Sequence, residues 1–233
     1  TLFWLNDELE PSWLAAADTP AFHRGVIAYD GFAIDADTGA KQASGKYPLN
    51  PGSAQSQATA NIVLAVLEAA LDVIAAQQDE LGRLDAIAGD GDHGIGMQRG
   101  LTAAVEAAKA AIAAQAGAGT TLIAAGDAWS DRAGGTSGML WGLILRNLGN
   151  AVGDAVKPGT ATIASGVAAA LQAVIDAGKA QLNDKTLVDV LYPFSAALMK
   201  SASQGLPTPE AWTAAAEVAK QSAEATKNLT PKI

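Results

Sequence analysis

The residues best suited to chemistry lie in the segment 85–100, which reads DAIAGDGDHGIGMQRG. Three carboxylates, those of Asp85, Asp90 and Asp92, fall within eight residues, and glycines flank the last two. Glycine adopts backbone angles that other residues avoid, so such a turn can direct several carboxylates to one point. Because Mg²⁺ prefers carboxylate, phosphate and water oxygens, the segment indicates a metal–phosphate site. A plain surface turn is the alternative, and an Asp-Gly-Asp tripeptide alone does not exclude it.

Two further loops carry polar residues between apolar stretches. Residues 134–138 read Gly-Gly-Thr-Ser-Gly, and residues 178–186 read Gly-Lys-Ala-Gln-Leu-Asn-Asp-Lys-Thr. A glycine-rich turn before a helix can bind phosphate, because the free N–H groups and the helix dipole attract anions. An ordinary helix cap uses the same residue types, and for residues 134–138 both interpretations stay open. For Asp184 or Thr186 taken singly, a cap of the following helix is the favoured interpretation.

Amphipathic helices are expected to position these loops. Apolar residues at helical spacing predict a helix over about 56–81, ended by Gly82, and a second helix after the Asp-rich loop. Further helical patterns cover about 121–132, 136–152, 161–178, 185–203 and 208–227. The last one has a start signal in Thr208-Pro209-Glu210, with Thr208 as its cap and Pro209 in its first turn. No strand pattern interrupts residues 56–227, so the main domain is predicted to be all-α.

The first 54 residues have a different character. Residues 2–5 read as a buried strand, and residues 25–54 have the glycine- and proline-rich composition of a linker, with a short extended run at 26–29. A strand that opens a chain needs a sheet to join. We therefore expect residues 1–24 to be the end of an upstream domain, with a short clip packed on the helical body as the alternative.

Composition narrows the class of protein. The 233 residues are 49% apolar, enough for a sizeable core, and we find no apolar run near the roughly 20 residues that span a bilayer. The chain has no cysteine, which excludes disulfides and thiolate metal sites and fits a reducing cytoplasm. A net charge of −9 disfavours nucleic acid and anionic membranes as partners. A phosphate ligand would therefore need a metal to supply positive charge.

The order of the three motifs resembles the L domain of the dihydroxyacetone kinases. The resemblance rests on Asp85, Gly-Asp-Gly-Asp-His-Gly at 89–94, Gly-Gly-Thr-Ser-Gly at 134–138 and Asp-Lys-Thr-Leu-Val-Asp at 184–189. It covers residues 55–233, while residues 1–24 look like the end of that family's substrate-binding K domain and 25–54 would be the linker. This order is that of the single-chain, ATP-dependent kinases.

The resemblance implies an antiparallel barrel of amphipathic helices whose loops at one end hold Mg-nucleotide. Asp85, Asp90 and Asp92 would then ligate Mg²⁺ ions that bridge the phosphates of ATP or ADP. The phosphate contacts would come from His93, Gly94, Ile95, Gly96, Thr136 and Ser137, and the nucleoside contacts from Gly178 and Leu187. Phosphoryl transfer depends mostly on positioning and charge neutralisation, which agrees with such a site.

No catalytic residue is expected within this chain. In the family a histidine of the K domain holds the ketose as a hemiaminal, and that domain is not included here. His93 is interpreted as a phosphate or loop-ordering contact, and His23 as a bystander. Arg99 is expected to pair with the aspartates, with a solvated helix residue as the alternative.

The sequence departs from the family pattern at three places. Gly96 stands where many relatives have Asn, and Asn183 where a glycine often precedes Asp-Lys-Thr. The chain also ends at Ile233, so we expect it to lack the segment that closes over the nucleotide and the last helix. The fragment is accordingly expected to be inactive alone and to bind Mg-nucleotide weakly or not at all.

The resemblance favours the nucleotide-binding half of a kinase that phosphorylates dihydroxyacetone or a similar small ketose. Its expected partner is a K-type domain, in cis or from the second subunit of a homodimer. One alternative is a non-catalytic L subunit that keeps ADP as a coenzyme in a phosphotransferase-coupled system. Another is a helical interaction domain without a ligand.

Overall fold

The computed structural model describes residues 18–19, 22–23 and 51–232. The chain divides into two units, Thr1–Tyr47 and Pro48–Ile233. In the first unit, the two-residue strands β1 (Asp18–Thr19) and β2 (Phe22–His23) pair antiparallel. The strand predicted at 2–5 and the extended run at 26–29 lie outside the described residues.

Within residues 51–232 the second unit is all-α, which confirms the predicted fold class. Its helices are α3 (Ala54–Asp85), α4 (His93–Ala113), α5 (Ala118–Ala133), α6 (Gly135–Val152), α7 (Thr160–Gly178), α8 (Val188–Ser203) and α9 (Thr208–Ala225), followed by the short 3₁₀-helix η2 (Thr226–Asn228).

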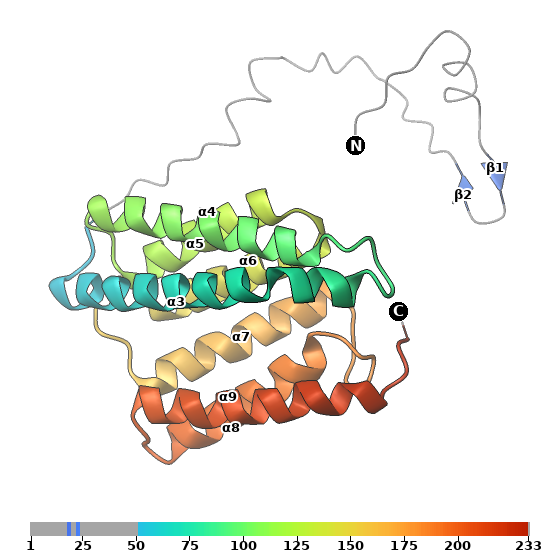
Figure 1. The fold of residues 1–233 in the computed structure, drawn as a ribbon. Helices are drawn as coiled ribbons and strands as arrows, with labels where there is room; N and C mark the ends of the chain where they lie inside the picture. Colours follow the sequence, from blue (N-terminus) through green and yellow to red (C-terminus); the bar gives the residue numbers. More distant parts are fainter. Residues whose placement is uncertain (1–17, 20–21, 24–50, 233) are drawn as a thin grey trace, which may run out of the picture. The chain divides into compact units, whose positions relative to one another are not determined.

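Each helix packs mainly against its neighbour in sequence, from α3 with α4 through α8 with α9. Successive helices run in opposite directions, so the loops after α3, α5 and α7 lie at one end of the molecule (Figure 1). The three polar motifs of the sequence occupy these three loops. In the described part of the chain α3 and α9 share no extended contact, so the ring of helices is open between them.

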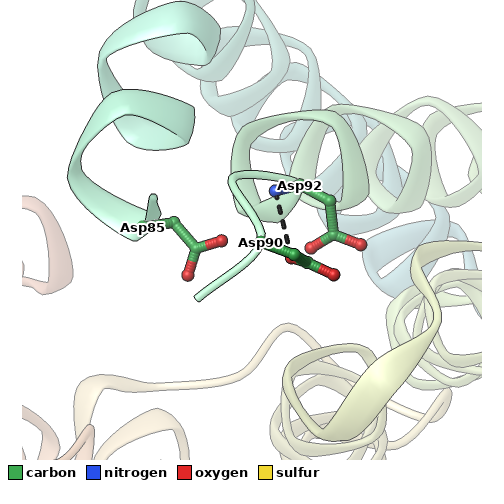
Figure 2. A group of neighbouring side chains, drawn as sticks. All are labelled: Asp85, Asp90 and Asp92. Carbon is green, nitrogen blue, oxygen red and sulfur yellow. Dashed lines mark hydrogen bonds between the residues drawn. The ribbon is translucent and has the colours of Figure 1, made fainter. Parts of the chain in front are cut away.

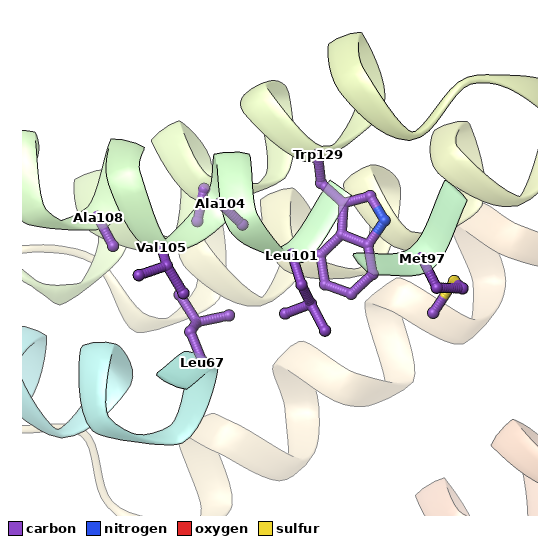
Figure 3. Packing of buried hydrophobic residues seen from close by; sticks show 8 residues of the cluster. Leu67, Met97, Leu101, Ala104, Val105, Ala108 and Trp129 are labelled. Carbon is purple, nitrogen blue, oxygen red and sulfur yellow. The ribbon is translucent and has the colours of Figure 1, made fainter. Parts of the chain in front are cut away.

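The largest group of buried residues lies between α3, α4 and α5 (Figure 3). Leu101 is 1% exposed and Trp129 is 4% exposed, and Trp129 stacks on Trp141 of α6 with ring centroids 5.5 Å apart. A β-carbon at Gly100 would lie 2.5 Å from the indole of Trp129, so only glycine lets α4 approach this ring. The packing fixes the end of α4 that carries the Asp-rich loop.

Two predicted helix ends were wrong for physical reasons. Gly82 does not end α3, which continues to Asp85; a β-carbon there would lie 2.9 Å from the carbonyl oxygen of Gly91, so this glycine makes room for the loop instead. Thr208 is not the cap of α9: Pro207 is the N-cap, and the Thr208 hydroxyl lies 3.0 Å from that of Thr160.

Two of the described helices, α3 and α7, are long and apolar enough to cross a membrane by length and composition alone. This corrects the expectation that no apolar segment approaches that length. Both helices contribute buried side chains to the helical unit, such as Leu67 of α3 and Val167 of α7. A core helix of a globular domain meets the same criteria.

Candidate metal–nucleotide site

The three aspartates of the first motif converge, as the sequence predicted. One oxygen of each of Asp85, Asp90 and Asp92 can be chosen so that all lie within 4.8 Å of one another. Asp85 comes from the end of α3, Asp90 from the loop, and Asp92 from the residue before α4 (Figure 2). Asp85 is half-buried and the other two are exposed, so the group opens to solvent.

Hydrogen bonds within the loop hold these carboxylates in place. The N–H of Gly91 donates to Oδ2 of Asp85 at 2.9 Å, and the N–H of Asp92 is 3.4 Å from Oδ1 of Asp90. Gly91 has a φ of +82°, in the region that side chains disfavour. A β-carbon at Gly89 would lie 2.7 Å from the Asp85 carboxylate, so glycine is needed here for the loop to close.

The donor set of this group suits a hard divalent cation. Among the described residues none of the three aspartates takes part in an ion pair, so their negative charges are uncompensated by protein groups. Carboxylate oxygens that face solvent leave coordination positions for water and phosphate, the arrangement in which proteins hold Mg²⁺. The cluster therefore fits the predicted metal.

The first turns of α4 and α6 come together at Ala133, the last residue of α5. A β-carbon at Gly96 of α4 would lie 3.2 Å from the carbonyl oxygen of Ala133, and one at Gly138 of α6 would lie 2.9 Å from its β-carbon. These contacts bring two helix N-termini to the same end of the molecule. Their free N–H groups make this end attractive to phosphate.

The Gly-Gly-Thr-Ser-Gly segment forms the turn between α5 and α6. Gly134 and Gly135 have φ angles of +72° and +62°, which explains two glycines in succession. Thr136 and Ser137 follow in the first turn of α6, and both are exposed. No side chain caps α6. The hydroxyls of Thr136 and Ser137 therefore do not serve as the helix cap that the alternative interpretation required.

Residues 93–96 form the first turn of α4, and the structure suits them to different roles. Gly94 is buried, and its β-carbon would lie 2.0 Å from the carbonyl oxygen of Gln78 in α3. Its residue type is therefore explained by helix packing, while its N–H remains at the start of the helix. The side chain of Ile95 is 48% exposed and has no hydrogen-bond donor, so only the N–H of this residue could contact a phosphate. Gly96 is close enough to Ala133 that an Asn side chain there would require the neighbouring backbone to shift.

Arg99 does not pair with the aspartates as expected. It is exposed on the outward face of α4 and forms no ion pair with any residue of the described segments.

The third loop lies at the same end and is held by a carboxylate whose role the sequence did not reveal. Leu187 packs against the buried cluster that includes Val174 and Val188, whereas Gly178 ends α7 with open space around it. Asp189 is 8% exposed and accepts the N–H groups of Asn183 at 2.5 Å and Thr186 at 2.8 Å. The last Asp of the Asp-Lys-Thr-Leu-Val-Asp motif was the only signal of this role.

Asp184 ties this loop to the C-terminal segment. It accepts the N–H of Gln181 at 2.7 Å, and this bond, with Lys232 nearby, holds the pKa of the Asp184 carboxyl below its ordinary value. The Nζ of Lys232 is 3.3 Å from Asp184, and that of Lys185 is 3.1 Å from the carbonyl oxygen of Leu229. The residues after η2 therefore cross the loop.

Asn183 occupies a position where the family pattern led us to expect glycine. Its φ is +72°, in the left-handed region that glycine, and next to it asparagine, adopts most readily. Replacing Asn183 with Val is expected to lower the free energy of unfolding by about 2 kcal/mol. Replacing it with Gly should change that free energy by less than about 0.5 kcal/mol. Denaturant titration measures both, with Gln181→Val as the control, and equal losses for the Val and Gly variants would contradict the prediction.

Comparison with known proteins relates this geometry to a family. Residues 87–233 match the model of the DAK2 domain. The chain is 48% identical over 233 residues to a protein of Pectobacterium atrosepticum named L-erythrulose kinase, and 43% identical over 235 aligned residues to a D-erythrulose kinase of Mycolicibacterium smegmatis. It is also 31% identical over 155 residues to the ADP-binding subunit DhaL of the PEP-dependent dihydroxyacetone kinase of Escherichia coli.

The alignments differ in how much of each protein they cover. All of this chain aligns with the two erythrulose kinases, but it spans only 39% and 40% of their lengths. The DhaL alignment covers 66% of this chain and 73% of DhaL.

Proposed function

Because this chain belongs to the DAK2-domain family, that of the L domain of dihydroxyacetone kinases, we propose that it is the nucleotide-binding part of an ATP-dependent ketose kinase. The observation that carries the proposal is the convergence of three carboxylates within 4.8 Å beside two helix N-termini. We place the activity in the cytoplasm, where ATP is available.

In this proposal Asp85, Asp90 and Asp92 would hold Mg²⁺, and the ion would supply positive charge that offsets the charge of the phosphates. The N–H groups of residues 93–95 and the hydroxyls of Thr136 and Ser137 would orient the phosphate oxygens. The N–H of Gly96 already donates to the carbonyl oxygen of Asp92 at 2.9 Å, so we propose that Gly96 serves the site by its small size. The loop between Gly178 and Leu187 contacts the nucleoside. Preorganised N–H groups stabilise charge without reorganising during the reaction, and this is the protein's main contribution to such a transfer.

For the acceptor we propose erythrulose, a four-carbon ketose, rather than dihydroxyacetone. The support is that the two relatives aligned over the whole chain at 43% identity or more are named erythrulose kinases. The remaining part of the full-length protein, in cis or from a second subunit, would bind this ketose. The coenzyme role of a DhaL-type subunit is the alternative, and the shorter alignment with DhaL at 31% identity supports it less.

The experiment is an assay of ketose-dependent ADP release by the full-length protein and by residues 1–233 alone. We expect turnover with L- or D-erythrulose to exceed that with dihydroxyacetone, since the acceptor fits the substrate-binding part. The isolated chain should release ADP at most slowly with either ketose, because it lacks a positioned acceptor, and proximity accounts for a large part of the rate. Efficient phosphorylation of a ketose by residues 1–233 would contradict this division of labour, and full-length turnover only with PEP as phosphoryl donor would favour the DhaL-type alternative.

A further inference from the structure

A recess on the outward face of α4 carries two arginines beside the candidate metal site. It has a volume of about 390 Å³ and is lined by Ile95, Gln98, Arg99, Thr102 and Glu106 of α4 and by Arg132 of α5, among others. Arg99 lies seven residues after Asp92, or about 10 Å along the helix axis. Arg132 comes two residues before Gly134, in the last turn of α5. The recess therefore adjoins both phosphate-binding turns.

These arginines differ from the other two arginines of the described segments. Arg83 is paired with Glu80 at 2.6 Å, and Arg146 with Asp127 at 2.6 Å. Arg99 and Arg132 are exposed and form no ion pair with a described residue, including Glu106, which also lines the recess. In a chain with 24 acidic and 15 basic residues, a recess lined by two arginines and one glutamate has the opposite sign to the prevailing charge.

The surroundings indicate what the recess binds. Ile95 is 48% exposed at its edge, which gives the surface an apolar element next to the two cations. An exposed apolar residue beside unpaired arginines is typical of protein–protein contacts, in which arginine is enriched. A protein surface docked here would place carboxylates next to Arg99 and Arg132, since opposite charges attract across an interface.

We propose that this recess is the docking surface for an acidic face of the remaining, substrate-binding part of the full-length protein. The inference rests on the proposed function, because a phosphoryl acceptor must be brought beside the phosphate turns. The erythrulose kinases are about two and a half times as long as this chain, so such a part has ample length to supply the face. Arg99 and Arg132 would orient it so that the ketose faces the terminal phosphate.

The test compares the full-length protein with its R99A/R132A variant. We expect kcat/KM for erythrulose to fall at least tenfold at low salt, while the Kd for Mg-ADP, measured by calorimetry, changes less than twofold. The wild-type kcat/KM should also decline with salt more steeply than that of the variant, because the docking contact is ionic. The matched control is K200A/K220A, which removes the same charge from α8 and α9, and its kcat/KM should stay within twofold of wild type.

A footprint separates this inference from the nucleotide site itself. In the nucleotide-free full-length protein, we expect phenylglyoxal to modify Arg99 and Arg132 at least tenfold more slowly than the exposed Arg83. Equal modification rates, or an unchanged kcat/KM in the variant, would overturn the proposal. Loss of Mg-ADP binding together with activity would also overturn it, by placing the arginines in the nucleotide site. If the wild-type protein binds no Mg-ADP, the proposed function fails, and the footprint still decides whether the recess is covered.

Discussion

Replacing Asp90 with Asn in the full-length protein is expected to reduce ketose-dependent ATP turnover about a thousandfold. The Asp90 carboxylate is one of three within 4.8 Å, and no cation among the described residues compensates for them. Without it, Mg²⁺ is held less firmly and phosphate charge stays uncompensated in the transition state, a loss of several kcal/mol. Steady-state kinetics at saturating Mg-ATP measures the change.

The control for this variant is the stability of the protein. Asp90 is exposed, and its only hydrogen bond within the group is the 3.4 Å contact from the N–H of Asp92, which an Asn oxygen can also accept. The free energy of unfolding without metal should therefore fall by less than about 0.5 kcal/mol, since surface substitutions have small effects. Turnover near that of the wild type in Asp90→Asn would show that this carboxylate is not a metal ligand.

Replacing Gly94 with Ala is expected to destabilise the helical unit by about 3 kcal/mol, because an added methyl group meets backbone rather than a movable side chain. Its β-carbon would lie 2.0 Å from the carbonyl oxygen of Gln78, so α4 would have to move away from α3. For a domain of this size the loss corresponds to a fall in Tm of about 10 °C. Thermal unfolding followed by circular dichroism measures it.

The matched control for Gly94→Ala is Gly178→Ala. Gly178 ends α7, and a β-carbon there has no atom within 4 Å, so Ala should leave the Tm unchanged or raise it slightly. A similar Tm for both variants would show that α3 and α4 are not packed as closely as the structure has them.

The helices and the cluster of three carboxylates could be predicted from sequence because their signals are local. Apolar residues at helical spacing predicted each helix, and three aspartates within eight residues of a glycine-rich segment are near one another along the chain. A plain turn and a metal-binding loop differ in whether the three carboxylates converge. The structure brings their oxygens within 4.8 Å of one another, and the hydrogen bond from the N–H of Gly91 to Asp85 that helps to hold them cannot be read from the sequence.

Features that depend on contacts between helices could not be predicted. Gly82 has the position of a helix terminator, yet α3 continues because the close approach of Gly91 requires a small residue there. Arg99 was expected to turn toward the aspartates, but the rotation of α4 set by Met97 and Leu101 in the core places Arg99 on the outward face. Apart from the place of Asp189 in the motif, the sequence shows no sign of its role, because its hydrogen bonds to the N–H groups of Asn183 and Thr186 depend on how the loop folds back.

The most direct test of the metal–nucleotide site is electron paramagnetic resonance of Mn²⁺, which substitutes for Mg²⁺, titrated into the protein with and without ADP. If Asp85, Asp90 and Asp92 hold the metal beside the nucleotide, ADP should increase the fraction of bound Mn²⁺ beyond the amount that the same concentration of ADP binds without protein. That increase should vanish in the Asp90→Asn and Asp92→Asn variants. An ADP-dependent increase of the same size in both variants would contradict the site.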